Sequence, residues 1–238
     1  MFVFLHRGST RRPWIDGVPP GRSHVSPSTY DHAYFHHAYH GDYDLHNPPR
    51  KAAFYLSQLV AVRPTGRLLD VGCAFGNFLA VAGQRYEAAG VDVSLDAVEV
   101  ARARLPGVRI SRASVLELGS DRKFDVVTCF DTLEHVTPLD DALKALRSVM
   151  APRGVLAVTV PVFDGLTGPV VRHLDHDPTH VWRQGRDFWW RKIEDHGLDV
   201  VRWVGLWRYL LPWRAYLFFG SRFLYRLSPA VMLIGREG

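Results

Sequence analysis

The 238-residue sequence is poor in cysteine and has no long apolar run. Two cysteines cannot build a disulfide framework, so a reducing compartment is expected. No apolar run approaches the ~18 residues of a membrane-spanning helix. The apolar start, residues 1–5, stops at His6-Arg7 and lacks the layout of a secretory signal. We therefore expect a cytoplasmic protein, or one that lies peripherally at the membrane surface.

Acidic residues are absent between Val200 and Arg236, where aromatic residues alternate with arginines. Residues 202–226 contain Arg202, Trp203, Trp207, Arg208, Tyr209, Trp213, Arg214, Tyr216, Phe218, Phe219, Arg222, Phe223, Tyr225 and Arg226. This composition suits the headgroup region of a membrane, and it equally suits a homodimer interface or an apolar lid over a substrate. Nucleic acid is not an expected partner, because no nucleic-acid motif accompanies the segment.

The length and composition are those of one α/β domain with appendages: 47% of residues are hydrophobic and 22% charged. The net charge of +5 permits an anionic partner without requiring one. Residues 1–47 are predicted to be an N-terminal arm, ending in a Tyr/His-rich flap at 30–46 whose histidines follow no metal-ligand spacing. Residues 48–238 form the predicted domain, with an aromatic and basic insertion at 206–229.

From residue 67 onward, short apolar segments alternate with amphipathic helical ones. Strands are predicted at 67–71, 89–93, 108–110, 124–129, 155–160, 198–204 and 231–236. Near-continuous apolar strands separated by amphipathic helices are typical of a parallel sheet that is covered on both faces. The prediction is a Rossmann-like, doubly wound α/β fold with a mostly parallel seven-stranded sheet. Its ligands should bind at the carboxyl ends of the strands.

The most informative motif is residues 68–79, in which an apolar run ends in Asp70 and a glycine turn precedes a helix-like run. Gly72 and Gly76 let the backbone turn sharply and approach a ligand. The next predicted strand ends in Asp92, where an acid would accept hydrogen bonds from ribose hydroxyls. The loop reads G-x-A-x-G and lacks the G-x-G-x-x-G of dinucleotide enzymes. We therefore expect a site for an adenosine-containing cofactor.

This loop resembles motif I of the class I S-adenosylmethionine (SAM) dependent methyltransferases. The resemblance continues through residues 90–94, 124–127 and 151–154, and through Leu133-Glu134-His135-Val136. The chain is similar to methyltransferases of type 11/23 and to the ubiquinone-biosynthesis O-methyltransferases. The resemblance implies an enzyme that uses SAM to methylate a small-molecule or lipid-like acceptor, with a hydroxyl as the expected acceptor group. It also implies that the last strand is antiparallel.

The resemblance also implies a set of cofactor-binding residues. These are Asp70, Gly72, Cys73, Ala74, Gly76, Asp92, Val93, Ser114 and Asp131. The sequence departs from the family pattern at Ala74, where glycine is usual, and at Ser114, where an Asp often faces the adenine. Adenine recognition then depends on a hydroxyl, on backbone groups, or on apolar packing from Val115 or Leu116.

Catalytic candidates follow the fourth and fifth predicted strands. In the first cluster, Glu134 and His135 brace the turn, or His135 acts as a general base, for which a pKa near 6.5 is suited. A third hypothesis is a divalent metal site formed by Asp131, Glu134 and His135; similar ubiquinone-biosynthesis enzymes carry a comparable cluster. His180 is a second candidate base, or it packs against the following helix.

The sequence leaves a second class of function open. A non-catalytic α/β protein that binds SAM, and that docks on a membrane or a partner through its C-terminal segment, would share most of these features. A dinucleotide-dependent oxidoreductase is the weaker alternative because the loop spacing differs. The acceptor cannot be read from these motifs.

Overall fold

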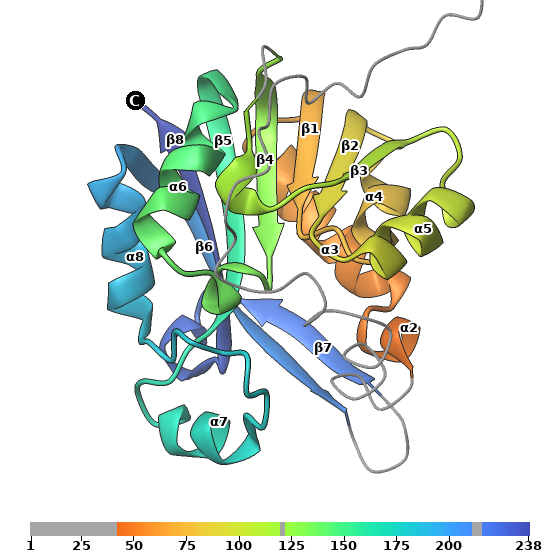
Figure 1. Ribbon diagram of the computed structural model, residues 1–238. Helices are drawn as coiled ribbons and strands as arrows, with labels where there is room; N and C mark the ends of the chain where they lie inside the picture. The colour runs from red at the N-terminus through yellow and green to blue at the C-terminus, as the bar shows by residue number, and fades with distance from the viewer. Residues whose placement is uncertain (1–41, 120–121, 211–215) are drawn as a thin grey trace, which may run out of the picture.

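The computed structural model describes residues 42–119, 122–210 and 216–238 (Figure 1). The predicted arm and most of the Tyr/His-rich flap therefore lie outside the described residues. The strands are β1 (Gly66–Val71), β2 (Tyr86–Asp92), β3 (Arg109–Arg112), β4 (Phe124–Phe130), β5 (Met150–Pro161), β6 (Leu198–Leu210), β7 (Tyr216–Ser221) and β8 (Ala230–Glu237). Within the described part of the chain they form an eight-stranded sheet in the order β3-β2-β1-β4-β5-β8-β6-β7.

Strands β1 to β5 are parallel, whereas β8 is antiparallel to both β5 and β6. Helices cover both faces of the sheet (Figure 1). On one face lie α3 (Pro49–Val60), α4 (Asn77–Ala82) and α5 (Leu95–Arg104), and on the other α6 (Leu139–Ser148) and α8 (Arg186–Asp195). The predicted doubly wound, mostly parallel α/β fold is confirmed, including its antiparallel last strand.

The central strands are apolar on both sides because each face meets a helical layer. On β1, Leu68 packs with α3 and α4 while Leu69 packs with α6. On β4, Val126 packs in the core on the α3 and α4 side, and Val127 packs in the core on the α6 side. Successive side chains on a strand point to opposite faces, so a continuous apolar run supplies two cores. This double burial fixes the register of the strands and therefore the position of the residues that follow them.

The second strand begins earlier than the sequence predicts, at Tyr86 instead of residue 89. The preceding helix α4 ends at Ala82. Tyr86 is buried and pairs with Gly66 at the start of β1. Its hydroxyl donates to the carbonyl oxygen of Arg63. These tertiary contacts place Tyr86 in the sheet, so the strand begins there.

The predicted insertion at 206–229 is largely an extension of the sheet. Strand β6 continues to Leu210, and β7 pairs with it from Gly205↔Ser221 to Leu210↔Tyr216. Trp207 and Phe219 stack on the resulting hairpin with their ring centroids 5.7 Å apart. This pairing adds an eighth strand to the seven that the sequence predicts. A short helix η4 (Tyr225–Leu227) then leads into β8.

Two further helices lie at the edge of the sheet where the parallel strands end (Figure 1). Helix α2 (Tyr43–His46) precedes α3, and α7 (Gly168–Leu174) follows β5 in a region predicted to begin as a loop. Asp42 caps α2 by accepting a hydrogen bond from the Leu45 amide. None of the described helices is long and apolar enough to cross a membrane.

Candidate functional site

The glycine loop after β1 has the backbone geometry that its sequence predicts. Gly72 and Gly76 have φ values of +77° and +80°, which favour glycine. A Cβ on Gly72 would lie 2.2 Å from Oγ1 of Thr132, so the loop passes directly against the turn after β4. Ala74 also has a positive φ, of 43°. A non-glycine residue in this region costs about 1–3 kcal/mol, which the surrounding structure must offset.

Asp92 holds this loop in place from the end of β2. Its Oδ2 accepts a hydrogen bond from the Ala74 amide at 2.8 Å, and its Oδ1 accepts one from the Ser94 amide at 2.9 Å. Burial raises the pKa of Asp92, although these amide hydrogen bonds oppose the rise. Each carboxylate oxygen can accept more than one hydrogen bond. Asp92 can therefore support the loop and still accept hydrogen bonds from a ligand.

Asp70 lies under the loop at the end of β1. Burial raises its pKa to about 7, while a hydrogen bond from Thr128 opposes this rise. Thr128 Oγ1 donates to Asp70 Oδ1 over 2.6 Å. The carboxyl is therefore poised between its charged and neutral forms near neutral pH. Through this hydrogen bond, Asp70 joins β1 to β4 beneath the glycine loop.

These residues line a pocket at the carboxyl ends of β1, β2 and β4, closed on one side by α2 and α3. Its lining consists of Tyr43, Asn47, Lys51, Ala52, Tyr55, Asp70, Val71, Gly72, Ala74, Phe78, Asp92, Val93, Ala113, Ser114, Val115, Leu116, Phe130, Asp131, Thr132, His135, Val136 and Thr137. Most of the sequence-predicted cofactor residues lie in it. Cys73 and Gly76 are not among the lining residues; Cys73 is buried with its sulfur beside Gly90.

Ser114 lies at the pocket wall after β3 and caps the short helix η2 (Val115–Glu117). Its hydroxyl oxygen accepts from the Leu116 amide at 3.3 Å, and Glu117 reaches back to the Ser114 amide. This capping box fixes the orientation of the side chain. Val115 and Leu116 lie beside it in the lining, which places one hydroxyl and two apolar side chains where adenine recognition is expected.

The sequence-based prediction missed a buried charge cluster on the wall formed by α3. Lys51 lies 3.7 Å from a carboxylate oxygen of Asp131, which also receives a hydrogen bond from Arg208 on β6. Burial lowers the pKa of Lys51 to about 8. Burial alone would raise the pKa of Asp131, but the charges of Arg208 and Lys51 outweigh it and hold the pKa near 2. Two cations thus share one carboxylate.

One signal could have revealed part of this cluster. Lys51 and Tyr55 are four residues apart on the core side of the predicted helix, and a lysine on an apolar face is unusual. Both are buried. Arg208 gives no such signal, because it lies on a strand more than 150 residues after Lys51 along the chain. Only the tertiary fold brings it to Asp131.

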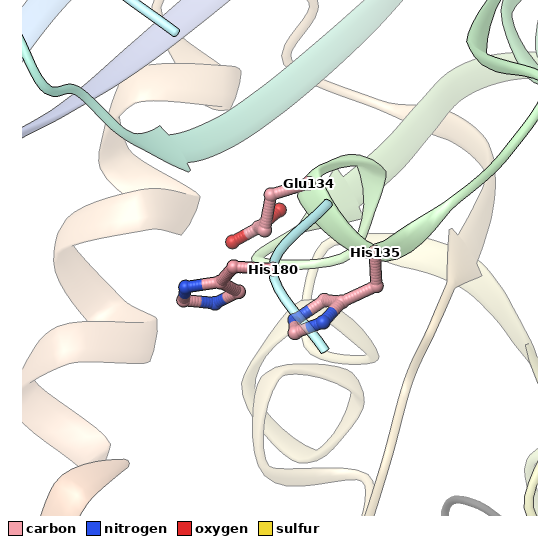
Figure 2. A group of neighbouring side chains, drawn as sticks. All are labelled: Glu134, His135 and His180. Carbon is pink, nitrogen blue, oxygen red and sulfur yellow. The ribbon is translucent and has the colours of Figure 1, made fainter. Parts of the chain in front are cut away.

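A second cluster joins the turn after β4 to the loop after α7. Figure 2 shows Glu134 and His135 on the turn, with His180 approaching from the other loop. One ligand atom from each lies within 4.8 Å of the others. The two imidazole rings are 4.6 Å apart between centroids. In the sequence, Glu134 and His135 belong to one candidate cluster and His180 to another, and the fold brings the two together.

Each histidine is oriented by a neighbour on the loop after α7. His180 Nδ1 lies 2.7 Å from Oδ1 of Asp175, and His135 Nδ1 lies 2.8 Å from Oγ1 of Thr179. Thr179 donates in turn to Asp177. His135 lines the pocket, whereas His180 lies behind it and is not among the lining residues. Of the two predicted bases, His135 is therefore the one that faces the pocket.

The cluster has strongly perturbed acid–base properties. Burial, aided by the charge of His180, lowers the pKa of His135 to about 4. Burial would also lower that of His180, but Asp175 and Glu134 outweigh it and raise the pKa above the usual value. Burial and the nearby Asp131 raise the pKa of Glu134 to about 8. Near neutral pH, His135 is thus neutral and Glu134 is largely protonated.

The alternative metal set of Asp131, Glu134 and His135 is distributed differently in space. Asp131 Oδ1 accepts a hydrogen bond from Thr159 at 2.8 Å, and its Oδ2 faces Arg208 and Lys51. Glu134 and His135 lie instead with His180. Glu134 Oε2 is buried and has no hydrogen-bond partner among the described residues.

Comparisons with known proteins agree with this geometry. A family model of the methyltransferase domain matches residues 43–227. The chain is 35% identical over 123 residues to a trans-aconitate 2-methyltransferase of Methylobacterium nodulans, covering 50% of this chain and 46% of that protein. It is 30% identical over 126 residues to a ubiquinone biosynthesis O-methyltransferase of Pasteurella multocida, covering 46% and 51%. The chain thus matches about half the length of these relatives.

Solved structures share the fold. A SAM-dependent methyltransferase of Thermotoga maritima aligns with a TM-score of 0.64 at 16% identity, covering 86% of this chain and 97% of that one. A magnesium protoporphyrin IX methyltransferase of Synechocystis aligns with a TM-score of 0.60 at 18% identity, covering 81% and 84%. The glycine loop, the acid after β2 and the family match over residues 43–227 together show that the chain belongs to the class I SAM-dependent methyltransferases.

Proposed function

We propose that the chain transfers a methyl group from SAM to a hydroxyl of a small-molecule or lipid-like acceptor. The observation that carries this proposal is one pocket lined both by the glycine loop with Asp92 and by a neutral, half-buried histidine, His135. The first pair suits an adenosine-containing cofactor, and the histidine suits removal of a proton. A hydroxyl acceptor needs both.

The pocket residues fit SAM. Asp92 retains acceptor capacity for ribose hydroxyls, and Ser114 with Val115 and Leu116 forms the adenine wall. The glycine loop passes close enough to the turn after β4 to exclude a side chain on Gly72, and Gly72, Ala74 and Thr132 all line the pocket. When bound, SAM supplies an electrophilic methyl group on its sulfonium. The protein itself supplies position and proton removal.

His135 is the base that we propose. Its pKa of about 4 keeps it neutral at pH 7, so the ring can accept a proton from a bound hydroxyl, and it does so as a weaker base than an imidazole with the ordinary pKa near 6.5. Thr179 holds the ring by its Nδ1 atom. His180, held by Asp175, lies 4.6 Å away between ring centroids and is placed to support the same proton transfer. Phe130 and Tyr55 line the same pocket and exclude water from the reacting atoms.

The acceptor remains at the level of a chemical class. One relative is named for trans-aconitate and another for ubiquinone biosynthesis, and both names describe small organic molecules. Lys51 of α3 lines the pocket, and Arg208 of β6 contacts the same carboxylate, that of Asp131. We propose that an anionic or polar acceptor would be distinguished at this wall.

Two measurements test the proposal. Calorimetry with S-adenosylhomocysteine (SAH) tests the cofactor site, and an absence of binding at millimolar ligand would refute the enzyme assignment. Incubation of cell extract with labelled SAM and the purified protein tests turnover and reveals the acceptor. Binding of SAH without any labelled product would favour a non-catalytic SAM-binding protein instead.

Variants of the two histidines test the base. His135→Gln should lower kcat by about 10²–10⁴-fold, with SAH affinity unchanged. His180→Gln should have a smaller effect because His180 is outside the pocket lining. His173→Gln, an exposed histidine on α7, is the matched control. Full activity in the double variant of His135 and His180 would remove both from the mechanism.

A further inference from the structure

Exposed apolar side chains concentrate on one part of the described surface. Apart from Leu95 and Val201, the exposed large hydrophobic residues in the described ranges all come from 166–181 or 217–227. Phe223 is fully exposed at 101%, and Leu166 is 83% exposed. Leucine and phenylalanine side chains this exposed are unfavourable in water unless another surface covers them. The concentration therefore calls for a partner.

Two of these segments, 166–174 and 222–227, lie side by side, and we call them the α7–η4 surface. A Cβ on Gly165 would be 3.1 Å from the Arg226 carbonyl oxygen, so the start of one segment touches the other. The buried Arg186 ties them together, because it binds Asp164 before α7 and the carbonyl oxygen of Tyr225 in η4. Figure 1 shows α7 at the edge of the sheet where the parallel strands end.

The α7–η4 surface carries positive charge and no acidic residue. Arg172, Arg222 and Arg226 are exposed on it, among Leu166, Val170, Leu174, Phe223, Leu224 and Leu227. Two acids that border it are already paired: Asp164 with Arg186, and Asp175 with His180 and Arg183. Asp187, at the start of α8, is exposed near its margin. The surface therefore presents apolar side chains interspersed with arginines.

We propose that the α7–η4 surface docks the protein on an anionic phospholipid bilayer. Protruding apolar side chains can enter the acyl boundary while arginines stay at the headgroups. A second copy of the chain would suit the surface less well, because a two-fold interface places a patch against itself and would oppose the three arginines. The docking does not depend on methyl transfer, and it moves the expected membrane contact from residues 202–226 toward α7 and η4.

The position of this surface relates it to the pocket. The loop that follows α7 carries Thr179, which lies 2.8 Å from Nδ1 of His135 in the pocket lining. A bilayer against α7 would therefore lie on the same side of the sheet as the pocket.

Vesicle co-sedimentation of the full chain tests the proposal directly. The probes are phosphatidylcholine vesicles with and without 30% phosphatidylglycerol, about a third of the lipid being anionic as in charged membrane surfaces. Wild-type protein should bind the anionic vesicles and lose binding at 0.5 M salt, about three times physiological ionic strength or more. Leu166→Ser with Phe223→Ser should weaken binding at least about tenfold, because two large apolar side chains leave the membrane.

Charge reversal tests the arginines separately. Each basic residue near an anionic surface contributes about fivefold in affinity, so Arg222→Glu with Arg226→Glu should reduce binding by roughly 25-fold or more. Val201→Ser and Arg85→Glu change an exposed valine and an exposed arginine outside the surface and should leave binding intact. Circular dichroism of every variant establishes that loss of binding is not loss of folding.

Three results would overturn the proposal. One is a wild-type protein that fails to bind anionic vesicles at low salt. Another is binding that survives both double variants while they remain folded. The third is a concentration-dependent dimer, detected by analytical ultracentrifugation, that Phe223→Ser abolishes without any vesicle binding by the wild type; that would make the surface an interface between copies. None of these readouts requires SAH binding or turnover, so they are independent of the proposed function.

Discussion

Glu134 is a carboxyl group buried beside two imidazoles, and its ionisation should be visible in the stability of the protein. Its pKa in the folded state is raised to about 8 from the usual 4.5. The contribution of the Glu134 carboxyl to the free energy of unfolding is therefore fully present below pH 4.5 and is lost as pH rises through 8. Glu134→Gln should remove this dependence, so the free energy of unfolding of the variant should rise by about 4 kcal/mol relative to wild type between pH 5 and pH 8.5.

Urea unfolding at several pH values measures this difference. Glu99→Gln, an exposed glutamate on α5, is the control and should run parallel to wild type. If Glu134→Gln also ran parallel to wild type, the carboxyl would not be titrating in the raised range.

Asp92 combines two tasks in one carboxylate, and the conservative change to asparagine separates them. Asp92→Asn places an amide N–H against one of the two backbone amides that the carboxylate now accepts from. Affinity for SAH should fall tenfold or more, about 1.4 kcal/mol. Calorimetry measures it, and Asp199→Asn on the exposed start of β6 serves as the control. An unchanged affinity would show that Asp92 supports neither the loop nor the ribose.

The glycine loop is the element on which the cofactor site depends most. Gly72→Ala introduces a Cβ 2.2 Å from Thr132 Oγ1, at a backbone angle that disfavours alanine. We expect destabilisation of about 1–3 kcal/mol together with loss of SAH binding. Gly107→Ala, where a Cβ would meet nothing within 4 Å, is the matched control. Thermal unfolding and calorimetry report the two effects, and a Gly72→Ala protein that binds SAH normally would contradict the assigned path of the loop.

Helix α3 illustrates how one element can serve both the core and the site. Leu59 packs in the core, Lys51 faces the pocket, and Ala52 and Tyr55 belong to both. Pro49 begins the helix because its missing amide is not needed there. The register set by the apolar residues thus determines where the ammonium group lies. A one-residue shift would remove Lys51 from Asp131.

At the scale of the whole molecule, cofactor binding should raise stability through mass action. A ligand at 100 times its Kd that binds only the folded state adds about 2.7 kcal/mol. For a chain of this size, that corresponds to an increase in Tm of roughly 5–10 °C. Thermal unfolding with graded SAH measures the shift. Asp92→Asn should show little of it at the same SAH concentration, and an equal shift in both proteins would indicate binding elsewhere.

The parallel part of the fold was predictable because its determinants are local. Residues 68–71 are apolar apart from Asp70, Gly72 follows, and an amphipathic helix comes next, so both strand and loop can be read from a few neighbouring residues. Strand β7 was not predictable in this way. Its residues 216–221 mix aromatic residues with glycine and become a strand by pairing with β6.

The candidate site likewise contains residues that the local sequence predicts and residues that it does not. Asp70 and Asp92 lie near the ends of predicted strands, Gly72 directly follows one, and all three line the pocket as expected. Lys51 and Arg208 reach Asp131 from opposite ends of the chain, and their meeting depends on the order of strands in the sheet. The approach of His180 to Glu134 likewise depends on a loop 45 residues further along the chain. Such contacts are set by long-range packing, and they cannot be predicted from the residues that neighbour each partner in the sequence.

Asp44 in helix α2 has a consequence for the time course of cofactor exchange. Its carboxylate accepts hydrogen bonds from Arg104 on α5 and from Asn77 on α4, and it flanks Tyr43 in the pocket wall. This fastening is exposed to solvent, so dissolved salt weakens it. The pocket wall at Tyr43 is therefore held in part by an ion pair whose strength depends on ionic strength. The residence time of a bound cofactor would then depend on ionic strength, whereas the methyl-transfer step itself would not.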